Sequence, residues 1–200
     1  WQCLAQTGAA NSSSALTAWQ GKGEAAVRLI AGSREDDSQG QFWLGVQIKL
    51  DPGWKTYWRH PGESGAAPRF YWEGSENLAV AKVHWPAPRR FNAFGYDVIG
   101  YTEEVVIPVL LTPIKKHQPI TTHLKLDYMI CANICIPMQA NLKLKLIEPD
   151  PDGLEATLVQ QYRDLVPKEA ELLKKVNSWL RKSKANGRLD RVFTRHLKVS

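Results

Sequence analysis

The sequence predicts a mainly β protein, an antiparallel β-sandwich that carries a short helical appendage at its C-terminus. Three observations predict it: apolar and polar residues alternate in short segments over residues 22–149, turn residues separate those segments, and a helical period begins only after Pro151. Several short strands with turns between them are typical of sandwiches. Their spacing alone does not distinguish an immunoglobulin-like sandwich from a jelly roll.

The first predicted strands are residues 24–32 and 41–50, which alternate apolar and polar residues on either side of the polar turn 34–40. This order favours a hairpin. After a second turn at 51–54, the aromatic and basic stretch 55–72 is predicted to be a short strand, an irregular loop and another strand, because proline and glycine interrupt it.

The next predicted strand is 78–85, where the alternation returns. Residues 86–101 are predicted to be a long loop, because they contain two prolines and two glycines. Residues 103–113 form the following predicted strand, in which Pro108 favours an edge or a bulge since proline donates no backbone hydrogen bond.

Both ends of the chain depart from the β pattern. Residues 1–21 are predicted to be a flexible lead. Their small residues resemble the end of a secretory signal peptide, and on that interpretation Cys3 belongs to a segment that is removed. A disordered chain end fits these residues equally well. Residues 150–182 are predicted to form two amphipathic helices, and the basic tail 183–200 is expected to be poorly ordered. The apolar residues at helical spacing are Leu154, Leu158, Tyr162 and Leu165, then Ala170, Leu173, Val176 and Leu180.

The overall composition excludes several classes of protein. The 200 residues suit one domain with an appendage. The net charge of +6 is mild, and its Lys and Arg residues are scattered outside the tail, so a nucleic-acid partner is not expected. No run of about 18 apolar residues is present to span a membrane, and three cysteines are too few for a disulfide-rich scaffold.

Two of these cysteines, Cys131 and Cys135, lie in the segment YMICANICIPM, between predicted strands 120–131 and 140–149. In a straight strand their Cα atoms would be about 13 Å apart, whereas a disulfide needs them within about 7 Å. A bond between them therefore requires a turn, which Asn133 tolerates. The closed loop would be small, so such a bond would contribute little to stability.

The residues themselves leave several interpretations of this segment open. Two packed thiols or a static disulfide fit the spacing. A zinc site lacks a second pair of ligands at suitable spacing, and no local signature indicates a cysteine-protease nucleophile. A copper(I) site is a further alternative. Copper(I) prefers soft ligands, and the four candidate ligands in this segment would all bind through sulfur atoms. They would come from Met129, Cys131, Cys135 and Met138.

Four stretches of the sequence resemble the N-terminal periplasmic domain of the DsbD family of thiol:disulfide interchange proteins, and the ScsB-like branch in particular. They are residues 53–78, 83–101, 105–113 and 128–144. The aromatic-rich loop is specific in combination with the Cys-x-x-x-Cys-x-Pro element, whereas the cysteine spacing alone is a weak signal. The resemblance implies an immunoglobulin-like sandwich in the periplasm of a Gram-negative bacterium, either free-standing or as the soluble part of a membrane-anchored protein.

The resemblance also implies a function. Cys131 and Cys135 would cycle between dithiol and disulfide, as in a thiol:disulfide oxidoreductase. They would relay reducing equivalents from a membrane-embedded electron donor domain to periplasmic thioredoxin-fold proteins. By analogy, Cys135 attacks the partner and Cys131 resolves the mixed disulfide. No cofactor and no metal are expected on this interpretation; a copper-tolerance module, or a non-catalytic interaction domain with a static disulfide, is the alternative.

In the family, a cap loop covers the cysteines until a partner arrives, and an apolar lid of this kind restricts access to a reactive pair. The matching residues here are Phe91, Asn92, Phe94 and Tyr96, with Phe94 in the cap position. The family cap carries acidic residues where Asn92 and Ala93 stand in this chain, so any effect of such carboxylates on the thiol pKa is not expected here.

A groove beside the pair is expected to be lined by Tyr57, Trp58 and Pro137. Trp54 and Trp72 are expected in the core instead, because large aromatic side chains dominate burial.

Overall fold

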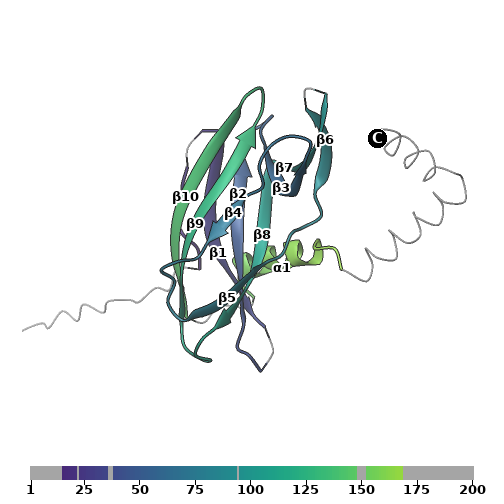
Figure 1. Cartoon of the computed structure of the whole chain (residues 1–200). Coiled ribbons are helices and arrows are strands. Elements are labelled where there is room, and N and C mark those ends of the chain that lie inside the picture. The colour runs from purple at the N-terminus through teal and green to yellow at the C-terminus, as the bar shows by residue number, and fades with distance from the viewer. Residues whose placement is uncertain (1–14, 22, 36–37, 94, 148–151, 169–200) are drawn as a thin grey trace, which may run out of the picture. The chain divides into compact units, whose positions relative to one another are not determined.

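The computed structural model describes residues 15–21, 23–35, 38–93, 95–147 and 152–168. Within them, ten strands and one helix follow one another along the chain (Figure 1). They are β1 (Ala25–Arg34), β2 (Phe42–Leu50), β3 (Lys55–Gly62), β4 (Arg69–Tyr71), β5 (Leu78–Val83), β6 (Arg89–Ala93), β7 (Tyr96–Thr102), β8 (Glu104–Pro113), β9 (Ile120–Cys131), β10 (Cys135–Leu146) and α1 (Leu154–Asp164).

The strands form two antiparallel sheets. One has four strands in the order β1-β2-β8-β5, and the other has six, in the order β10-β9-β3-β7-β6 with β4 also paired to β9. The hairpin predicted for the first two strands is present as β1 and β2. The arrangement confirms the predicted immunoglobulin-like antiparallel sandwich.

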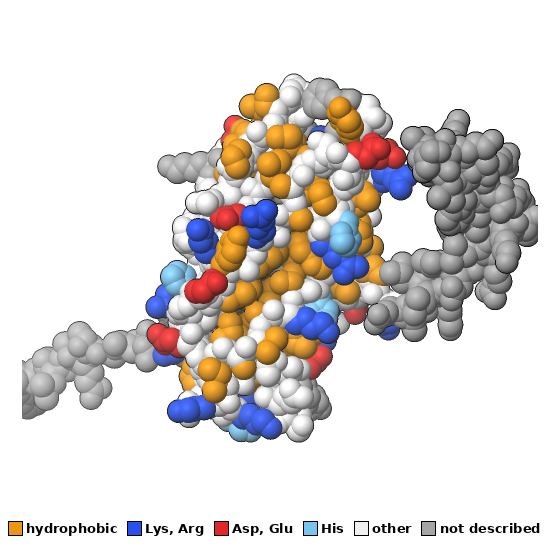
Figure 2. Space-filling view, viewed as in Figure 1, with side chains coloured by type: hydrophobic (Ala, Val, Ile, Leu, Met, Phe, Trp, Pro, Cys, Tyr) orange, Lys and Arg blue, Asp and Glu red, His pale blue; other side chains and the backbone are white. Residues whose placement is uncertain are grey.

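The main core lies between the sheets and is built by the alternating residues that predicted the strands. In β2 and β9 the fully buried side chains are separated by two positions, as in Phe42 and Leu44 and again in Leu124 and Leu126. Each such side chain contributes roughly 1.5–3 kcal/mol when removed from water. Apolar side chains remain visible in a band on the face seen in Figure 2, and half-buried aromatic residues pack against the core: Trp54, Trp58, Phe70, Trp72 and Trp85.

The prediction of a long loop over residues 86–101 is wrong, because β6 and β7 form a hairpin there. The alternation is weak in this hairpin for a steric reason. At Gly100 a Cβ would overlap the backbone carbonyl of Thr56. Glycine is therefore required at a position where an alternating strand would carry a side chain, and the alternation is interrupted. The pairs in register run from Arg89 with Gly100 to Ala93 with Tyr96.

The interpretation of Pro108 also needs correction. Its strand, β8, lies between β2 and β5 and is therefore not an edge strand. The Pro108 carbonyl accepts a hydrogen bond of 2.8 Å from the backbone N–H of His84, just after the last residue of β5. The N–H that proline lacks would point to the same side, so the missing donor coincides with the end of the pairing between β5 and β8.

Residues 15–20, within the stretch expected to be a flexible lead, pair with the outer edge of β1. Leu16 bridges Ile30 and Gln20 bridges Val27, and the Thr17 N–H donates to the Leu29 carbonyl at 2.9 Å. This pairing covers an edge whose backbone groups would otherwise be open to other chains.

Helix α1 packs on the face of the four-stranded sheet that points away from the main core (Figure 1). Gly45 makes the close contact possible, because a Cβ there would lie 2.7 Å from Ile30 and 2.8 Å from Val159. Arg163 fixes the end of the helix by pairing with Glu35 at 2.9 Å. The second predicted helix and the tail 183–200 lie outside the described residues. No helix in the described ranges is long and apolar enough to cross a membrane.

Candidate active site

The cysteine pair lies at the tip of the β9–β10 hairpin. Cys131 and Cys135 are partners in register, their Cα atoms are 4.1 Å apart, and a disulfide of 2.06 Å joins their sulfur atoms. Within the turn, the Ala132 N–H donates to the Ile134 carbonyl at 3.0 Å. The turn that a bonded pair requires is therefore present, and the tight register of twelve paired residues on each strand holds the two sulfur atoms together.

The pair lies on the outer face of the six-stranded sheet, away from the main core. Tyr128 and Ile130 of β9 point into that core, so Met129 and Cys131, which alternate with them, point outward. Lys55 of β3 is in register with Cys131, which places Tyr57 on the same outer face. The site is thus built on rigid strands but is separate from the residues that stabilise the sandwich.

The two sulfur atoms have different surroundings. Cys131 is only 4% exposed and forms a small apolar cluster with Tyr57 and Val98, against which Phe91 and Met129 pack. Cys135 is exposed. Cys135 is therefore the more accessible of the two cysteines, so the two halves of the disulfide lie in unsymmetrical surroundings.

Tyr57 touches both sulfur atoms from β3. Its hydroxyl donates a hydrogen bond of 2.8 Å to Cys131 Sγ and lies 3.9 Å from Cys135 Sγ. Tyr57 itself is 3% exposed, and burial raises its pKa above the usual value for a tyrosine. Tyr57 was expected to line a groove; instead it lies buried against the sulfur atoms.

A loop over residues 63–68 covers the ring of Tyr57. Gly65 has a φ of +96° and lies so close to the ring that a Cβ at this position would overlap it. The loop is tied to β7 by two hydrogen bonds: the Glu63 N–H donates to the Asp97 carbonyl at 2.9 Å, and the Asp97 N–H donates to Glu63 Oε2 at 2.8 Å. No role was predicted for this loop from the sequence. The glycine at position 65 was the available signal, because glycine allows the backbone to approach a neighbouring side chain closely.

The expected cap residues take different positions around the β6–β7 hairpin. Phe91 packs against the cluster that contains Cys131. The Asn92 side chain accepts a hydrogen bond of 3.3 Å from the Gly95 N–H, so it shapes the turn of the hairpin. Tyr96 is 54% exposed, and Phe94 lies outside the described residues.

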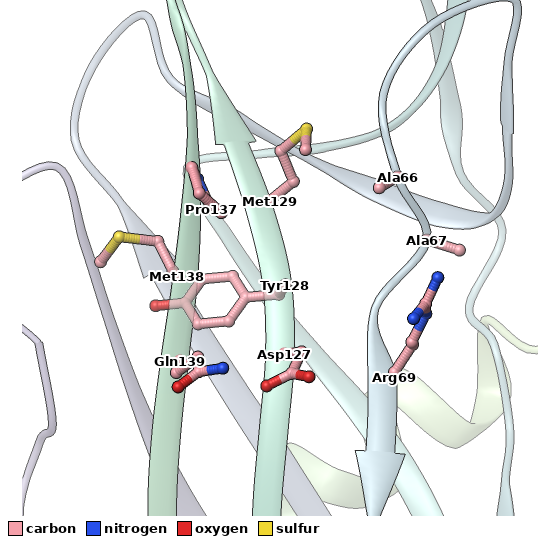
Figure 3. Close-up of a pocket in the computed structure, with 9 residues that line it drawn as sticks. All are labelled: Ala66, Ala67, Arg69, Asp127, Tyr128, Met129, Pro137, Met138 and Gln139. Carbon is pink, nitrogen blue, oxygen red and sulfur yellow. The ribbon is translucent and has the colours of Figure 1, made fainter.

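A cavity of about 540 Å³ lies beside the pair on the outer face of β9 and β10 (Figure 3). Pro137 and Met129, in register with each other and two residues from the cysteines, lie at the end nearest to the pair. Arg69 and Asp127 are in register across β4 and β9 in the same cavity, and Asp127 Oδ1 is buried without a hydrogen-bond partner. The lining residues are Ala66, Ala67, Arg69, Asp127, Tyr128, Met129, Pro137, Met138 and Gln139.

Trp58 is not part of this cavity. It alternates with Tyr57 and packs against the main core, with its ring 5.5 Å from that of His60. Of the three residues expected to line the groove, the structure therefore places only Pro137 in the cavity wall.

The four sulfur ligands of the copper alternative do not converge. Met129 packs with the Cys131 cluster, whereas Met138 packs against the main core, and the two thioethers point apart (Figure 3). In the described parts of the chain, no group of three or more His, Cys, Asp and Glu residues is arranged to hold a metal ion.

Known proteins are similar to this chain in sequence and in fold. Residues 24–147 match the family described as thiol:disulfide interchange protein DsbD, N-terminal. The N-terminal periplasmic domain of ScsB from Proteus mirabilis is similar in structure, with 34% sequence identity and a TM-score of 0.63 over 76% of this chain. The match covers 60% of the ScsB chain.

A second solved structure, the reduced N-terminal domain of DsbD from Neisseria meningitidis, has 16% identity and a TM-score of 0.34, and the match covers 59% of this chain and 82% of that one. This similarity is too low to support an inference. No curated protein sequence matches the chain.

Proposed function

Because the chain belongs to the family of DsbD N-terminal domains, we propose that it relays reducing equivalents by thiol–disulfide exchange through Cys131 and Cys135. The observation that carries the proposal is the unsymmetrical disulfide, with Cys135 exposed and Cys131 buried on an outer face of the sheet. A small disulfide loop contributes little to stability, so the arrangement suits chemistry better than support of the fold.

Reduction begins when a donor thiolate attacks Cys135 Sγ. The bond between Cys131 and Cys135 breaks, a mixed disulfide forms between the donor and Cys135, and Cys131 leaves as a thiolate that takes a proton. A second donor thiolate then attacks the donor sulfur of the mixed disulfide and releases Cys135. The donor ends as a disulfide, and the domain has gained two electrons and two protons.

Delivery follows the same path in reverse. The Cys135 thiolate attacks the disulfide of an acceptor, and one acceptor sulfur leaves as a thiolate. Cys131, which is held beside Cys135 by the hairpin register, then attacks Cys135 Sγ. This step reforms the disulfide and releases the acceptor as a dithiol.

The donor in this proposal is a membrane-embedded domain, and the acceptors are thioredoxin-fold proteins of the periplasm. The periplasmic location of the similar ScsB domain supports this location. Two features next to the pair suit such partners: the apolar side chain of Ile134, which is 65% exposed between the cysteines, and the cavity beside Met129 and Pro137. The β6–β7 hairpin, through Phe91, is the proposed shield of the pair.

Matched cysteine variants test this proposal. Cys131→Ser leaves the exposed thiol and is expected to trap a thioredoxin-fold protein as a stable mixed disulfide, whereas Cys135→Ser leaves only the buried thiol and is expected to trap much less. The double variant is the control for other thiols, and unfolding curves check that all three variants fold. Equal trapping by the two single variants, or none by either, would contradict the proposal.

The reduction potential of the pair is a second test that needs no partner. It can be measured by equilibration in glutathione or dithiothreitol buffers followed by alkylation of free thiols. We expect a value in the range of exchange proteins, about −120 to −270 mV. A value below about −300 mV would identify a structural disulfide and remove the basis of the relay.

A further inference from the structure

We propose that the Tyr57 hydroxyl is a catalytic group of the exchange reaction, which stabilises the Cys131 thiolate as it leaves when Cys135 is attacked. This inference rests on the proposed function and adds a residue to its chemistry. It assigns a role to a tyrosine that lies 74 residues before Cys131 in the sequence.

The hydroxyl distinguishes between the two sulfur atoms. It donates to Cys131 Sγ at 2.8 Å, whereas Cys135 Sγ lies 3.9 Å away. Negative charge that develops on Cys131 is therefore met at once by the short hydrogen bond, while charge on Cys135 would meet only the longer contact. Attack at the exposed Cys135, which expels Cys131, is consequently the favoured direction of cleavage.

Cys131 needs this donor because it is buried. A buried anion without a partner is strongly disfavoured, and Cys131, which is 4% exposed as a residue, has little access to water. Within the described part of the chain, Tyr57 provides the side-chain hydrogen bond to this sulfur. Burial raises the pKa of Tyr57, so the phenol keeps its proton at neutral pH and acts as a donor.

The surroundings hold the hydroxyl in place before the reaction. The loop at Gly65 lies against one side of the Tyr57 ring, and Val98 packs beside it. Gly100, in register with Tyr57 on β7, has no side chain that competes for this space. A donor that is already oriented requires no rearrangement when charge develops, which is the basis of electrostatic stabilisation in enzymes.

The step remains balanced with Tyr57 included. The incoming thiolate forms a bond to Cys135 Sγ, and the electron pair of the broken bond goes to Cys131 Sγ. Tyr57 shares its proton in a hydrogen bond without transferring it, and the Cys131 thiolate is protonated afterwards by solvent. In the reverse step the same hydrogen bond holds Cys131 as the thiolate that attacks Cys135.

The test compares Tyr57→Phe with Tyr101→Phe in the whole chain. Both variants remove a buried hydroxyl, but that of Tyr101 donates to the Pro86 carbonyl at 2.8 Å, away from the pair. We expect reduction by dithiothreitol to be about 10- to 100-fold slower in Tyr57→Phe, the usual worth of a hydrogen bond to a charged group. Tyr101→Phe is expected to lose stability and keep the wild-type rate.

A second readout is the pKa of Cys131, followed by thiolate absorbance in the Cys135→Ser background. It is expected to rise by about one unit or more in Tyr57→Phe. The same charged residues surround the pair with and without the Tyr57→Phe substitution, so the difference in the Cys131 pKa reports on the hydroxyl alone. These charged residues are Lys55, Glu63, Arg89, Arg90, Asp97 and Asp127. An unchanged rate or an unchanged pKa would overturn the inference.

The two proposals fail separately. If the wild type exchanges with a thioredoxin-fold protein and Tyr57→Phe matches it, only the role of Tyr57 is wrong. If Tyr57 controls reduction by dithiothreitol but no partner is reduced, only the relay is wrong. Should Tyr57→Phe not fold, a fluorinated tyrosine at position 57 keeps the ring and strengthens the donor, so the pKa of Cys131 should fall; a constant value would overturn the inference.

Discussion

Replacing Gly65 by alanine tests whether the loop over residues 63–68 holds Tyr57 against the sulfur atoms. Two costs are expected. The φ of +96° at Gly65 is a conformation that alanine adopts only with strain, of order 1–3 kcal/mol. The new methyl group would also overlap the Tyr57 ring, and overpacking of this kind costs roughly 1–3 kcal/mol more.

A matched variant separates these two costs. Gly53 has a φ of +87°, and a Cβ there would meet nothing within 4 Å. Gly53→Ala therefore carries the backbone strain alone. The difference in the free energy of unfolding between the two variants should equal the packing term, about 1–3 kcal/mol. Urea unfolding followed by tryptophan fluorescence measures it, since the chain has eight tryptophans.

The same pair of variants reports on the chemistry. If the loop orients Tyr57, Gly65→Ala should change the rate of reduction of the disulfide, while Gly53→Ala should reduce at the wild-type rate. Equal unfolding midpoints for the two variants, together with equal reduction rates, would refute the reasoning, because the Gly65 loop would then not constrain the ring.

Two further predictions concern the face covered by α1. Arg163→Ala removes an ion pair with Glu35 at 2.9 Å and a stack over the Trp43 ring at 4.0 Å, so it should lower the free energy of unfolding by about 1 kcal/mol; an unchanged urea midpoint would count against these contacts. The pKa of His84 lies below its usual value because the side chain is buried and because the positive charges of Lys82 and Arg163 are near. The native state therefore binds fewer protons than the unfolded state, and the free energy of unfolding should fall as pH drops below about 6.5. His84→Gln should flatten that decline, and parallel stability curves for the two proteins would show that His84 does not cause it.

The unsymmetrical pair suits the two reactions of the proposed relay. In that proposal the exposed Cys135 reacts with either partner, and the buried Cys131 reacts only with Cys135. Both cysteines belong to a hairpin whose register is fixed by its own strands, so we expect the two sulfur atoms to stay close after reduction. The sandwich core on the other face of the sheet is independent of this chemistry.

Local pattern determined much of the fold. The alternation of apolar and polar residues predicted most strands, because a strand with one buried face must alternate. A bond between Cys131 and Cys135 required a turn between their strands, and the antiparallel register of β9 and β10 contains that turn. The pattern failed at β6 and β7, where Gly100 leaves no room for a side chain and proline precedes the hairpin.

The sequence also indicated Cys131 and Cys135 as the candidate pair, through the family resemblance and not through their spacing alone. It did not determine their environment. Met129 and Met138 are near neighbours in the chain, yet they face opposite sides of the hairpin. Tyr57 and Trp58 are adjacent, and only the register of β3 on β9 decides which of them meets the sulfur atoms.

The decisive contacts of the site join residues far apart in the chain, such as Tyr57 with Cys131 and Glu63 with Asp97. A pattern of neighbours carries no information about such contacts, because they depend on strand order and on which face each strand turns outward. The sequence by itself therefore determined most of the strands and, through the family resemblance, the candidate cysteine pair. Tertiary structure alone decided which sulfur is buried and which hydroxyl lies beside it.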